Sequence, residues 1–596
     1  MLVTIEQVAG KTFHYVIVGG GAAGIALAAK LSEDASKTVL VLEAGHDNLN
    51  DPAVLRPSHG DTFGNDKYAW NLQTVPQPHT NNRAHIWTRG KGIGGSTAIN
   101  ILAYSKPPAY DVDAFERLGN PGFNWKNLQT IFNKFEGYVP PTDTTLAKSP
   151  LIGGLEGLGT EGSLKLTIAP GMSHLQAIAR EAVINNGIPH AASPYAGETR
   201  GFSVVATSWD TSSMTRSYGG SAFYKPNSNR PNLLVLARAH VHRVVTKKLE
   251  NGDVTATGVE FNHEGKNSVV HVGKDVVVCA GTLLSPKVLE LSGIGDKKVL
   301  DKFGIPVKVD LPGVGANAQE HIGSGISFEL KDGVAQADLK LFRDGTETTP
   351  KPAQDTPQEM PMFSFTMASL DQFSSRSAEI IKTAKETIKS RWDSYSPGLQ
   401  KQYELQLERL EQKQVVVEMV FHPGVSPASN APSTAFPHVP VIDYSLTMFV
   451  DAPSAGKQYA SLTQHITSAD PAVPPEVDPH YFEEDLDLQL MVEDLRFLRK
   501  LAATSPLKDI MADELNPGVE TQSDEELRNF IKSYLVTTWR GMLPREQSGV
   551  VDSKFKVYGT TNIRVADLSV LPLQVASHTQ SVAYAIGTYA AGVIVA

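Results

Sequence analysis

The sequence predicts an α/β fold that contains a Rossmann-like nucleotide-binding domain. Residues 13–45, FHYVIVGGGAAGIALAAKLSEDASKTVLVLEAG, combine a strand, a glycine turn, a helix and a second strand. Apolar strand-like runs return from Asn232 onward and indicate that the same domain resumes there. A chain of 596 residues has room for about three or four domains. We therefore expect the nucleotide-binding domain to be assembled from segments that lie far apart in the sequence.

The first elements follow from local patterns. Residues 14–18 are mostly β-formers, and the glycine turn after them leads into a helix that is expected to end near Leu31. A second strand is expected over residues 38–42, ending at Glu43. A strand, a helix and a strand in this order predict a parallel pair joined by a right-handed crossover.

Later segments give coarser signals. Residues 81–105 are glycine-rich and are expected to form a loop, and residues 111–136 indicate a helical segment broken at residues 119–121. The charged residues 377–414 and the acidic residues 480–530 both predict helices. The last 15 residues, VAYAIGTYAAGVIVA, are apolar but shorter than the roughly 20 residues that span a bilayer. We expect them to form a helix of the core.

Charge and composition limit the partners. The net charge of −10 argues against nucleic acid or an anionic membrane. The first 13 residues show no basic region followed by an apolar one, so no secretory signal is expected. The single cysteine, Cys279, lies in an apolar run and is expected to be a buried strand residue. We expect a cytoplasmic protein, a monomer or homodimer, that acts on a small molecule and has no nucleic-acid or membrane partner.

The first glycine turn predicts dinucleotide binding. Glycines at this spacing permit a tight turn, a close approach of the backbone to a pyrophosphate and close packing of the helix. The N-terminus of the helix then faces the phosphates. Glu43 stands at the end of the second strand, where a carboxylate bonds ribose hydroxyls. The residues of the predicted turn are Gly19, Gly21, Ala22, Ala23 and Gly24. This turn by itself leaves FAD and NAD open.

Motifs in the rest of the chain distinguish between them. Residues 89–100, RGKGIGGSTAIN, and residues 281–295, GTLLSPKVLELSGIG, resemble the first and second signatures of the glucose–methanol–choline (GMC) oxidoreductases. Residues 311–317 with Glu320-His321, and the closing residues 562–572, NIRVADLSVLP, are similar to segments of the same family in the same order. The resemblance points to an aryl-alcohol-oxidase-like or biosynthetic member of fungal type.

The resemblance implies FAD and the residues that hold it. The first signature would lie along the flavin, the backbone of Val241 at the adenine, and the backbone of Asp567 at the pyrophosphate–ribityl region. In covalent members a flavin-linking histidine stands near the start of the first signature. His85 is close to that position but out of register, so non-covalent FAD is expected. The first-signature residues assigned to the cofactor are Arg89, Gly95, Ser96 and Asn100.

The resemblance also implies the domain layout. An FAD-binding domain would comprise residues 1–150, 226–322 and 541–596. A substrate-binding domain would comprise residues 151–225 and 323–540 and would contain an antiparallel sheet flanked by helices. The closing segment of the FAD-binding domain would contribute residues to the active site.

The active site implied by the family departs from its usual pattern. Members that oxidise alcohols place two polar residues opposite the flavin, and His578 occupies the second position. At the first position a gap-free alignment puts Leu535 and a gapped one puts Arg540, so neither supplies a histidine. His578 could act alone as acid and base, while Arg540 could bind a carboxylate or stabilise an oxyanion. Trp539 either lines the pocket or belongs to the core.

Three hypotheses follow. The first is hydride transfer from the alcohol of a small aromatic or polyketide-like metabolite to flavin N5, with His578 as acid and base. The second is a non-redox cyclase, dehydratase or isomerase of secondary metabolism that retains FAD, which the missing histidine motivates. The third is an inactive FAD-binding scaffold. Histidines and the cysteine show no metal-ligand spacing, so no metal is expected.

Overall fold

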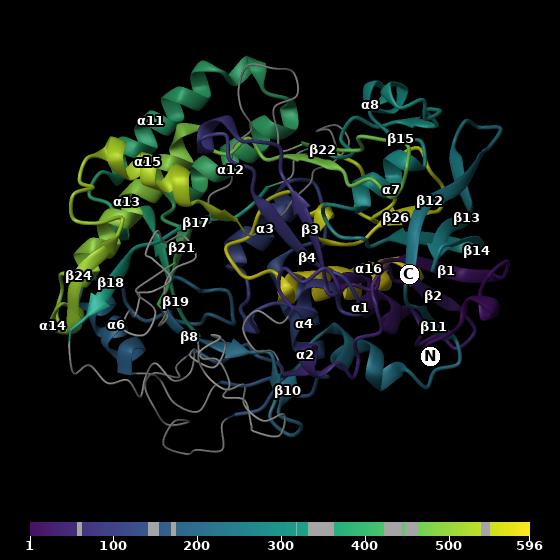
Figure 1. Cartoon of the computed structure of the whole chain (residues 1–596), viewed down its shortest axis with the longest axis horizontal. Coiled ribbons are helices and arrows are strands. Elements are labelled where there is room, and N and C mark those ends of the chain that lie inside the picture. The colour runs from purple at the N-terminus through teal and green to yellow at the C-terminus, as the bar shows by residue number, and fades with distance from the viewer. Residues whose placement is uncertain are drawn as a thin grey trace.

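Two seven-stranded sheets organise the chain, and they lie at opposite ends of the molecule in Figure 1. The structure is a computed structural model. It describes residues 1–56, 62–140, 154–168, 174–316, 319–331, 363–421, 444–447, 463–537 and 549–596.

The first sheet is the predicted nucleotide-binding sheet. Its strand order is β11-β2-β1-β14-β13-β12, with β26 paired to β14. β1, β2 and β11 run parallel, and the C-terminal half of β14 runs parallel to both β1 and β26. The strands are β1 (Thr12–Val18), β2 (Val39–Leu42), β11 (Leu233–Leu236), β12 (Ala239–Lys248), β13 (Val254–His263), β14 (Lys266–Val278) and β26 (Ile563–Val565). The predicted parallel pair and the return of the chain after Asn232 are therefore present.

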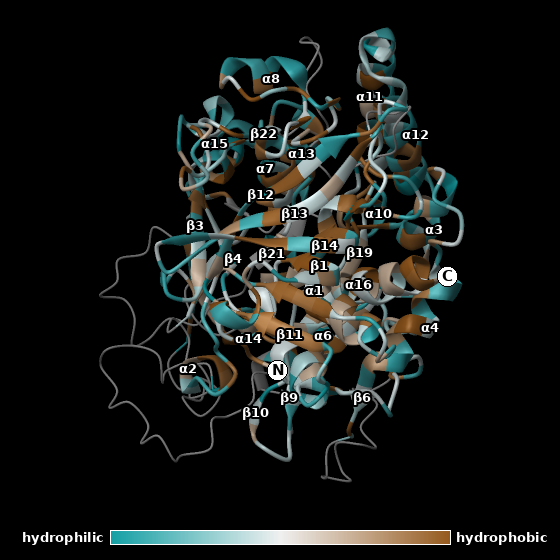
Figure 2. Ribbon diagram, turned by 90° about the vertical axis from the view of Figure 1, so that its right-hand side faces the viewer, coloured by the Kyte–Doolittle hydropathy of each residue, from teal (hydrophilic) through white to brown (hydrophobic). Residues whose placement is uncertain are grey.

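The first and last helices pack against each other beside this sheet. α1 (Ala22–Leu31) follows the glycine turn, and α16 (Gln580–Val595) includes the apolar C-terminus. A Cβ on Gly587 would lie 2.1 Å from the carbonyl oxygen of Ala23, so only glycine permits this approach. Figure 2 shows both helices as apolar ribbons in the middle of the molecule. The expected core helix is present, and no helix of the described ranges is long and apolar enough to cross a membrane.

The second sheet is antiparallel throughout, in the order β25-β17-β21-β20-β19-β8-β5. One face packs on α6 (His174–Asn185) and α13 (Asp485–Ala502) in a large hydrophobic core. The opposite face carries Phe365 and Met367 toward the C-terminal segment at Ala576. The strands are β5 (Ala103–Tyr104), β8 (Gly201–Thr207), β17 (Ile322–Ser324), β19 (Phe363–Ser369), β20 (Val415–Val420), β21 (Tyr444–Thr447) and β25 (Val536–Thr537).

Helices are present in each of the other segments predicted to be helical. The break at residues 119–121 separates α3 (Ala109–Arg117) from α4 (Trp125–Phe135). Residues 377–414 form two helices, because Ser396 caps a new one that begins at Pro397. The acidic segment 480–530 contains α13 and the start of the amphipathic α15. The helices named here for the first time are α11 (Ser377–Ser390), α12 (Pro397–Glu411) and α15 (Asp524–Tyr534).

Two local expectations are wrong. Residues 81–105 are not all loop, because Ile86–Gly90 form β4 and pair with β3 (Ala69–Gln73). The β-formers Ile86, Trp87 and Thr88 outweigh the glycines around them. Cys279 is buried as expected but lies one residue beyond the end of β14. In addition, β5 belongs to the second sheet although its residues fall in the segment assigned to the first domain.

Candidate active site

Two glycine loops meet at the start of α1. The amide of Gly94 donates to the carbonyl of Gly20 at 2.8 Å, and a Cβ on Gly95 would lie 2.8 Å from the Cα of Gly21. Gly95 also has a positive φ of 54°. The predicted dinucleotide turn and the first-signature loop are therefore in direct backbone contact, as one cofactor site requires.

The three glycines of the turn serve different purposes. A Cβ on Gly19 would lie 2.4 Å from the carbonyl oxygen of Cys279, and a Cβ on Gly24 would lie 2.1 Å from that of Gly19. A Cβ on Gly21 would meet only the Cα of Gly95, at 3.9 Å. The packing of the protein therefore requires Gly19 and Gly24 but leaves open space at Gly21. This space fits a glycine that allows a ligand to approach the backbone.

The N-terminus of α1 fits the phosphates of that ligand. Gly21 is the N-cap residue, and no side chain caps the helix there. The first-turn amides, which include those of Ala22 and Ala23, have no acceptor within an α-helix and carry the positive end of its dipole. A pyrophosphate between the two glycine loops would accept hydrogen bonds from such amides.

Glu43 holds three loops together at this site. Its carboxylate accepts hydrogen bonds from the amides of Gly20 at 2.8 Å, Gly45 at 2.7 Å and Gly92 at 2.9 Å. Burial raises the pKa of Glu43, while these three amides and Lys91 oppose the shift. The side chain therefore joins the end of β2 to both glycine loops. Its bond to a ribose stays a prediction.

The first-signature side chains mostly bond within the protein. Arg89 is half-buried, and burial lowers its pKa to about 9 against the opposing charges of Glu320 and Tyr481. Ser96 accepts a hydrogen bond from the amide of Gly90 at 3.1 Å. Asn100 donates to the side-chain oxygen of Gln580 at 2.8 Å, which links this loop to α16.

Arg216 supports the same loop, and the sequence reasoning missed it. The side chain is 1% exposed and donates to Asn100 through both the carbonyl, at 2.8 Å, and the side-chain oxygen, at 2.5 Å. It also donates to the carbonyls of Val54 and Thr97. Burial lowers its pKa to about 9. Its position in a turn-rich stretch gave no local sign of this role.

Val241 and Asp567 are the two positions at which a backbone contact to the cofactor is predicted. Val241 is buried on β12 opposite Phe261. The carboxylate of Asp567 accepts from the amide of Gly281 at 2.9 Å, the hydroxyl of Ser285 at 2.6 Å and the amide of Ser569 at 2.8 Å. The side chain thus joins the second signature to the closing segment, which is compatible with a cofactor contact through its backbone.

His578 lies against the second sheet. Its Nε2 is 2.8 Å from Oε1 of Glu418, and its ring stacks on Phe365 with centroids 4.7 Å apart and planes 14° from parallel. Its amide donates to the hydroxyl of Ser105 at 3.0 Å. The side chain of His578 is 24% exposed, whereas that of Glu418 is fully buried. A partly accessible imidazole is therefore held in one orientation by a buried carboxylate and an aromatic ring.

Glu418 and Phe365 were not predicted as site residues. They come from the neighbouring strands β20 and β19, in a part of the chain without a recognised motif. The only local signal is the carboxylate of Glu418 in the otherwise apolar run VVVEMV. A charged residue in a fully buried strand requires a polar partner, and this rule could have marked Glu418 as a candidate.

The other predicted position is only partly described. Leu535 is 3% exposed and packs in the hydrophobic core with α13 and α15. It contributes no polar group to the site. Trp539 and Arg540 lie outside the described residues, so their roles stay predictions. Within the ranges that the structure describes, no three His, Cys, Asp or Glu side chains are grouped to hold a metal ion.

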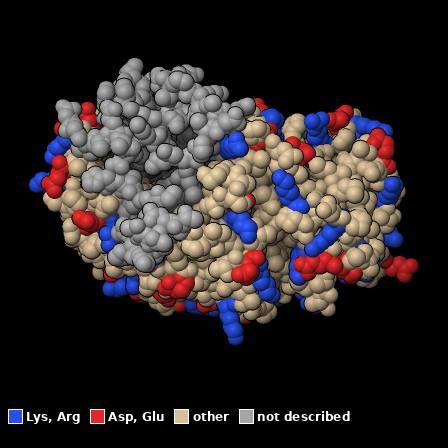
Figure 3. Space-filling model, turned by 90° about the horizontal axis from the view of Figure 1, so that it is seen from below, with Lys and Arg blue, Asp and Glu red and all other residues tan. Residues whose placement is uncertain are grey.

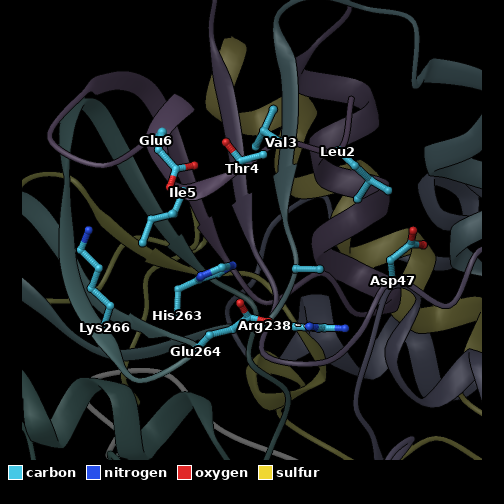
Figure 4. A pocket seen from close by; sticks show the side chains of 11 residues that line it. Leu2, Val3, Thr4, Ile5, Glu6, Asp47, Arg238, His263, Glu264 and Lys266 are labelled. Carbon is cyan, nitrogen blue, oxygen red and sulfur yellow. Dashed lines mark hydrogen bonds and ion pairs between the residues drawn. The ribbon is translucent and has the colours of Figure 1, made fainter.

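A separate open pocket of about 790 Å³ lies between the N-terminal residues 2–6 and the hairpin of β13 and β14 (Figure 4). The N-terminal residues 2–6, Asp47, Arg238 and His263 are among its lining residues, and Glu264 pairs with Arg238 at its side. None of the residues predicted for the cofactor or for catalysis lines it. The pocket is therefore distinct from the site around His578.

Known proteins share this architecture. Residues 13–323 match the N-terminal family model and residues 463–587 the C-terminal family model described as GMC oxidoreductase. The GMC oxidoreductase family protein Mala s 12 of Malassezia sympodialis is 32% identical over 98% of this chain and 93% of its own length. The dehydrogenase mpl7 of Monascus purpureus is 30% identical over 98% of this chain and 96% of its own.

A solved structure agrees with these matches. The FAD-dependent oxidoreductase from Chaetomium thermophilum has a TM-score of 0.83 and is 26% identical, covering 98% of this chain and 99% of its own. The order of the motifs, the paired glycine loops and the matches over both ends of the chain lead to one conclusion. The chain belongs to the GMC oxidoreductase family.

Proposed function

We propose that the protein uses non-covalently bound FAD to oxidise the alcohol of a small aromatic or polyketide-like metabolite. The observation that carries the proposal is the pairing of His578, just before α16, with the buried Glu418 of β20. When bound, FAD supplies the acceptor for a hydride at flavin N5. The chain must then supply a group that takes the hydroxyl proton.

His578 is that group. Its Nε2 faces Glu418, which leaves Nδ1 as the ring atom for the proton of a substrate hydroxyl. As the imidazole takes the proton, the carboxylate of Glu418 stabilises the positive charge and fixes the ring orientation. Phe365 restricts the ring plane by stacking on it. The three side chains together form an oriented base beside the cofactor site.

The surroundings of His578 favour an apolar substrate. The cluster next to it consists of apolar side chains on the inner face of the second sheet and on the C-terminal segment. An apolar cluster of this kind beside His578 supports an apolar substrate rather than a charged one. Its members are Ala103, Val205, Phe365, Met367, Val415, Val420 and Ala576. On one face of the molecule, Figure 3 shows basic and acidic side chains interspersed, as suits a small-molecule enzyme better than a nucleic-acid-binding protein.

The cofactor is proposed to be non-covalent because the candidate linking histidine is already engaged. Nε2 of His85 is 2.9 Å from the hydroxyl of Thr80, and the ring packs edge-on against Tyr481. Burial lowers the pKa of His85 to about 4. These contacts hold the His85 ring within the protein, which supports non-covalent binding.

A non-redox reaction is the second candidate. The sequence contains no histidine between residues 481 and 577, so the pair typical of alcohol-oxidising relatives is incomplete. An enzyme that retains FAD for structure or polarisation while it cyclises, dehydrates or isomerises its substrate would need only one acid–base group. His578 would serve either reaction.

An anaerobic titration separates the two. Purified protein is titrated in turn with benzyl alcohol, 4-methoxybenzyl alcohol and each of a panel of polyketide alcohols. The flavin absorbance at about 450 nm is followed. Bleaching by an alcohol supports oxidation, and product formation without bleaching supports the non-redox reading. His578→Ala should retain FAD and lose turnover. A variant that remains active would remove His578 from the mechanism.

A further inference from the structure

Side chains from distant parts of the chain hold the segment that carries His578. We call residues 572–578 the site segment. Each of five of its residues uses a backbone group to bond a side chain that lies elsewhere. The contacts are Gln402 to the carbonyl of Pro572 at 2.6 Å, Gln319 to the amide of Gln574 at 2.8 Å, His321 to the carbonyl of Val575 at 3.0 Å, Asp111 to the amide of Ala576 at 2.7 Å, and Ser105 to the amide of His578 at 3.0 Å.

Asp111 differs from the other side chains that bond the site segment because it takes part in a buried ion pair. One of its carboxylate oxygens accepts the amide of Ala576, and the other bonds the guanidinium of Arg409. The side chains of Asp111 and Arg409 are 3% and 6% exposed. An acceptor with a fixed negative charge makes a shorter and stronger hydrogen bond than a neutral acceptor. The bond to Ala576 is therefore the one among the five contacts whose acceptor is an ion-paired carboxylate.

Arg409 comes from α12, a helix outside the two regions that match the family models. Gln402 lies seven residues earlier on the same helix, which is two turns and therefore the same face. From that face Gln402 contacts Pro572 directly, and Arg409 acts through Asp111 of α3. One face of α12 thus supports both ends of the stretch from Pro572 to Ala576.

We infer that Asp111 and Arg409 are positioning residues that fix the site segment and thereby hold the His578 ring against Glu418. The inference rests on the proposed role of His578 as acid and base. Ala576 is only two residues from His578, so a shift of its amide moves the ring. Displacement of a catalytic group by about 1 Å can cost on the order of a hundredfold in rate.

Two matched double variants test the hydrogen bond without leaving a buried charge unpaired. In the D111N/R409M variant an amide oxygen can still accept the bond from Ala576, and in D111L/R409M a side chain of similar shape offers no acceptor. Both variants remove the ion pair as a unit, which is far less costly than removing one partner. Hydrogen exchange by mass spectrometry on FAD-loaded protein reports the protection of residues 572–579, and flavin reduction by benzyl alcohol reports the chemistry.

We expect the site segment of D111N/R409M, which keeps a neutral acceptor but loses the charge and Arg409, to exchange faster than that of the wild type and more slowly than that of D111L/R409M. In D111L/R409M the amides of the site segment should exchange about tenfold faster than in the wild type. The variant should lower kcat more than it raises KM, with FAD content unchanged. Equal exchange in the two variants would overturn the inference. Faster exchange in D111L/R409M with unchanged kcat would also overturn it, because the segment would then not need to be fixed.

Arg117→Met is the control. Arg117 on α3 forms an exposed ion pair with Glu408 on α12, so this variant cuts a link between the same two helices without touching the site segment. It should leave both exchange and kcat unchanged. The exchange measurement does not depend on His578 being the base. If His578→Ala remains active while D111L/R409M loses protection, the proposed function fails but the anchoring of the segment stands.

Discussion

Removing the charge of Glu418 should slow hydride transfer about a hundredfold. The Glu418→Gln side chain keeps the size and an oxygen acceptor 2.8 Å from Nε2 of His578, so only the charge is lost. At an effective dielectric constant of about 20, a full imidazolium at that distance is stabilised by about 6 kcal/mol. If half of the proton charge has reached the ring in the transition state, about 3 kcal/mol is lost, which corresponds to about a hundredfold in rate.

The assay is anaerobic stopped-flow reduction of the flavin by the alcohol identified in the titration. It isolates the chemical step from oxygen and from product release. The full burial of Glu418 means that solvent does not replace its charge. FAD content and the melting temperature are measured on the same samples to detect loss of structure.

Another buried glutamate provides the control. Glu290 is fully buried and its Oε1 lies 2.6 Å from Nδ1 of His465, in a pair away from His578. Glu290→Gln therefore makes the same chemical change in a similar environment and should leave the reduction rate within about threefold. A fully loaded Glu418→Gln variant that reduces its flavin as fast as Glu290→Gln would refute the reasoning.

Three other predictions concern the fold and the cofactor site. Gly21→Val should fold but purify without FAD, because its Cβ meets open space, whereas Gly24→Val should not fold, because its Cβ would lie 2.1 Å from a carbonyl oxygen. The absorbance spectrum and the yield of soluble protein check both, and a yellow, fully loaded Gly21→Val would contradict the placement of the phosphates. Burial and the charge of Arg83 lower the pKa of His85 to about 4 in the folded protein. As pH drops from about 6.5 toward 4, the His85 side chain therefore takes up a proton in the unfolded state before it does so in the folded state. The free energy of unfolding falls over that pH range. His85→Gln should flatten that part of the melting temperature profile, and an unchanged slope would remove His85 as a cause. Lys106→Met should lower the free energy of unfolding by about 3–5 kcal/mol, because it leaves the fully buried Glu136, its partner at 2.9 Å, without a counter-ion. Denaturant unfolding measures this loss. The double variant Lys106→Met with Glu136→Gln should be more stable than Lys106→Met alone.

The parts of the site that rest on local geometry could be predicted from the sequence. The spacing of Gly19, Gly21 and Gly24 between a strand and a helix defines the turn without knowledge of the rest of the fold. The apolar pattern of the C-terminus likewise predicts a buried helix. His578 was identified through the family resemblance, because the residues around it match the family's second active-site position.

The partners of His578 could not be predicted in the same way. Phe365 and Glu418 meet it only because β19 and β20 pair in one register, and a slip of β20 by one residue would turn Glu418 to the face opposite Phe365. Arg409 reaches Asp111 through the packing of α12, which amphipathic periodicity does not specify. The tertiary pairing of distant segments therefore decides which side chains surround His578.

The contact between α1 and α16 has a consequence for biosynthesis. α1 emerges from the ribosome early, but α16, which packs against it, spans residues 580–595 and is made much later. At a synthesis rate of about 5–20 residues per second, roughly half a minute to two minutes pass between the synthesis of α1 and that of α16. The strand that completes β14, β26, arrives equally late. We therefore expect the nascent chain to expose α1 until α16 has been made, and a truncation that removes α16 to abolish the cofactor site as completely as an early one.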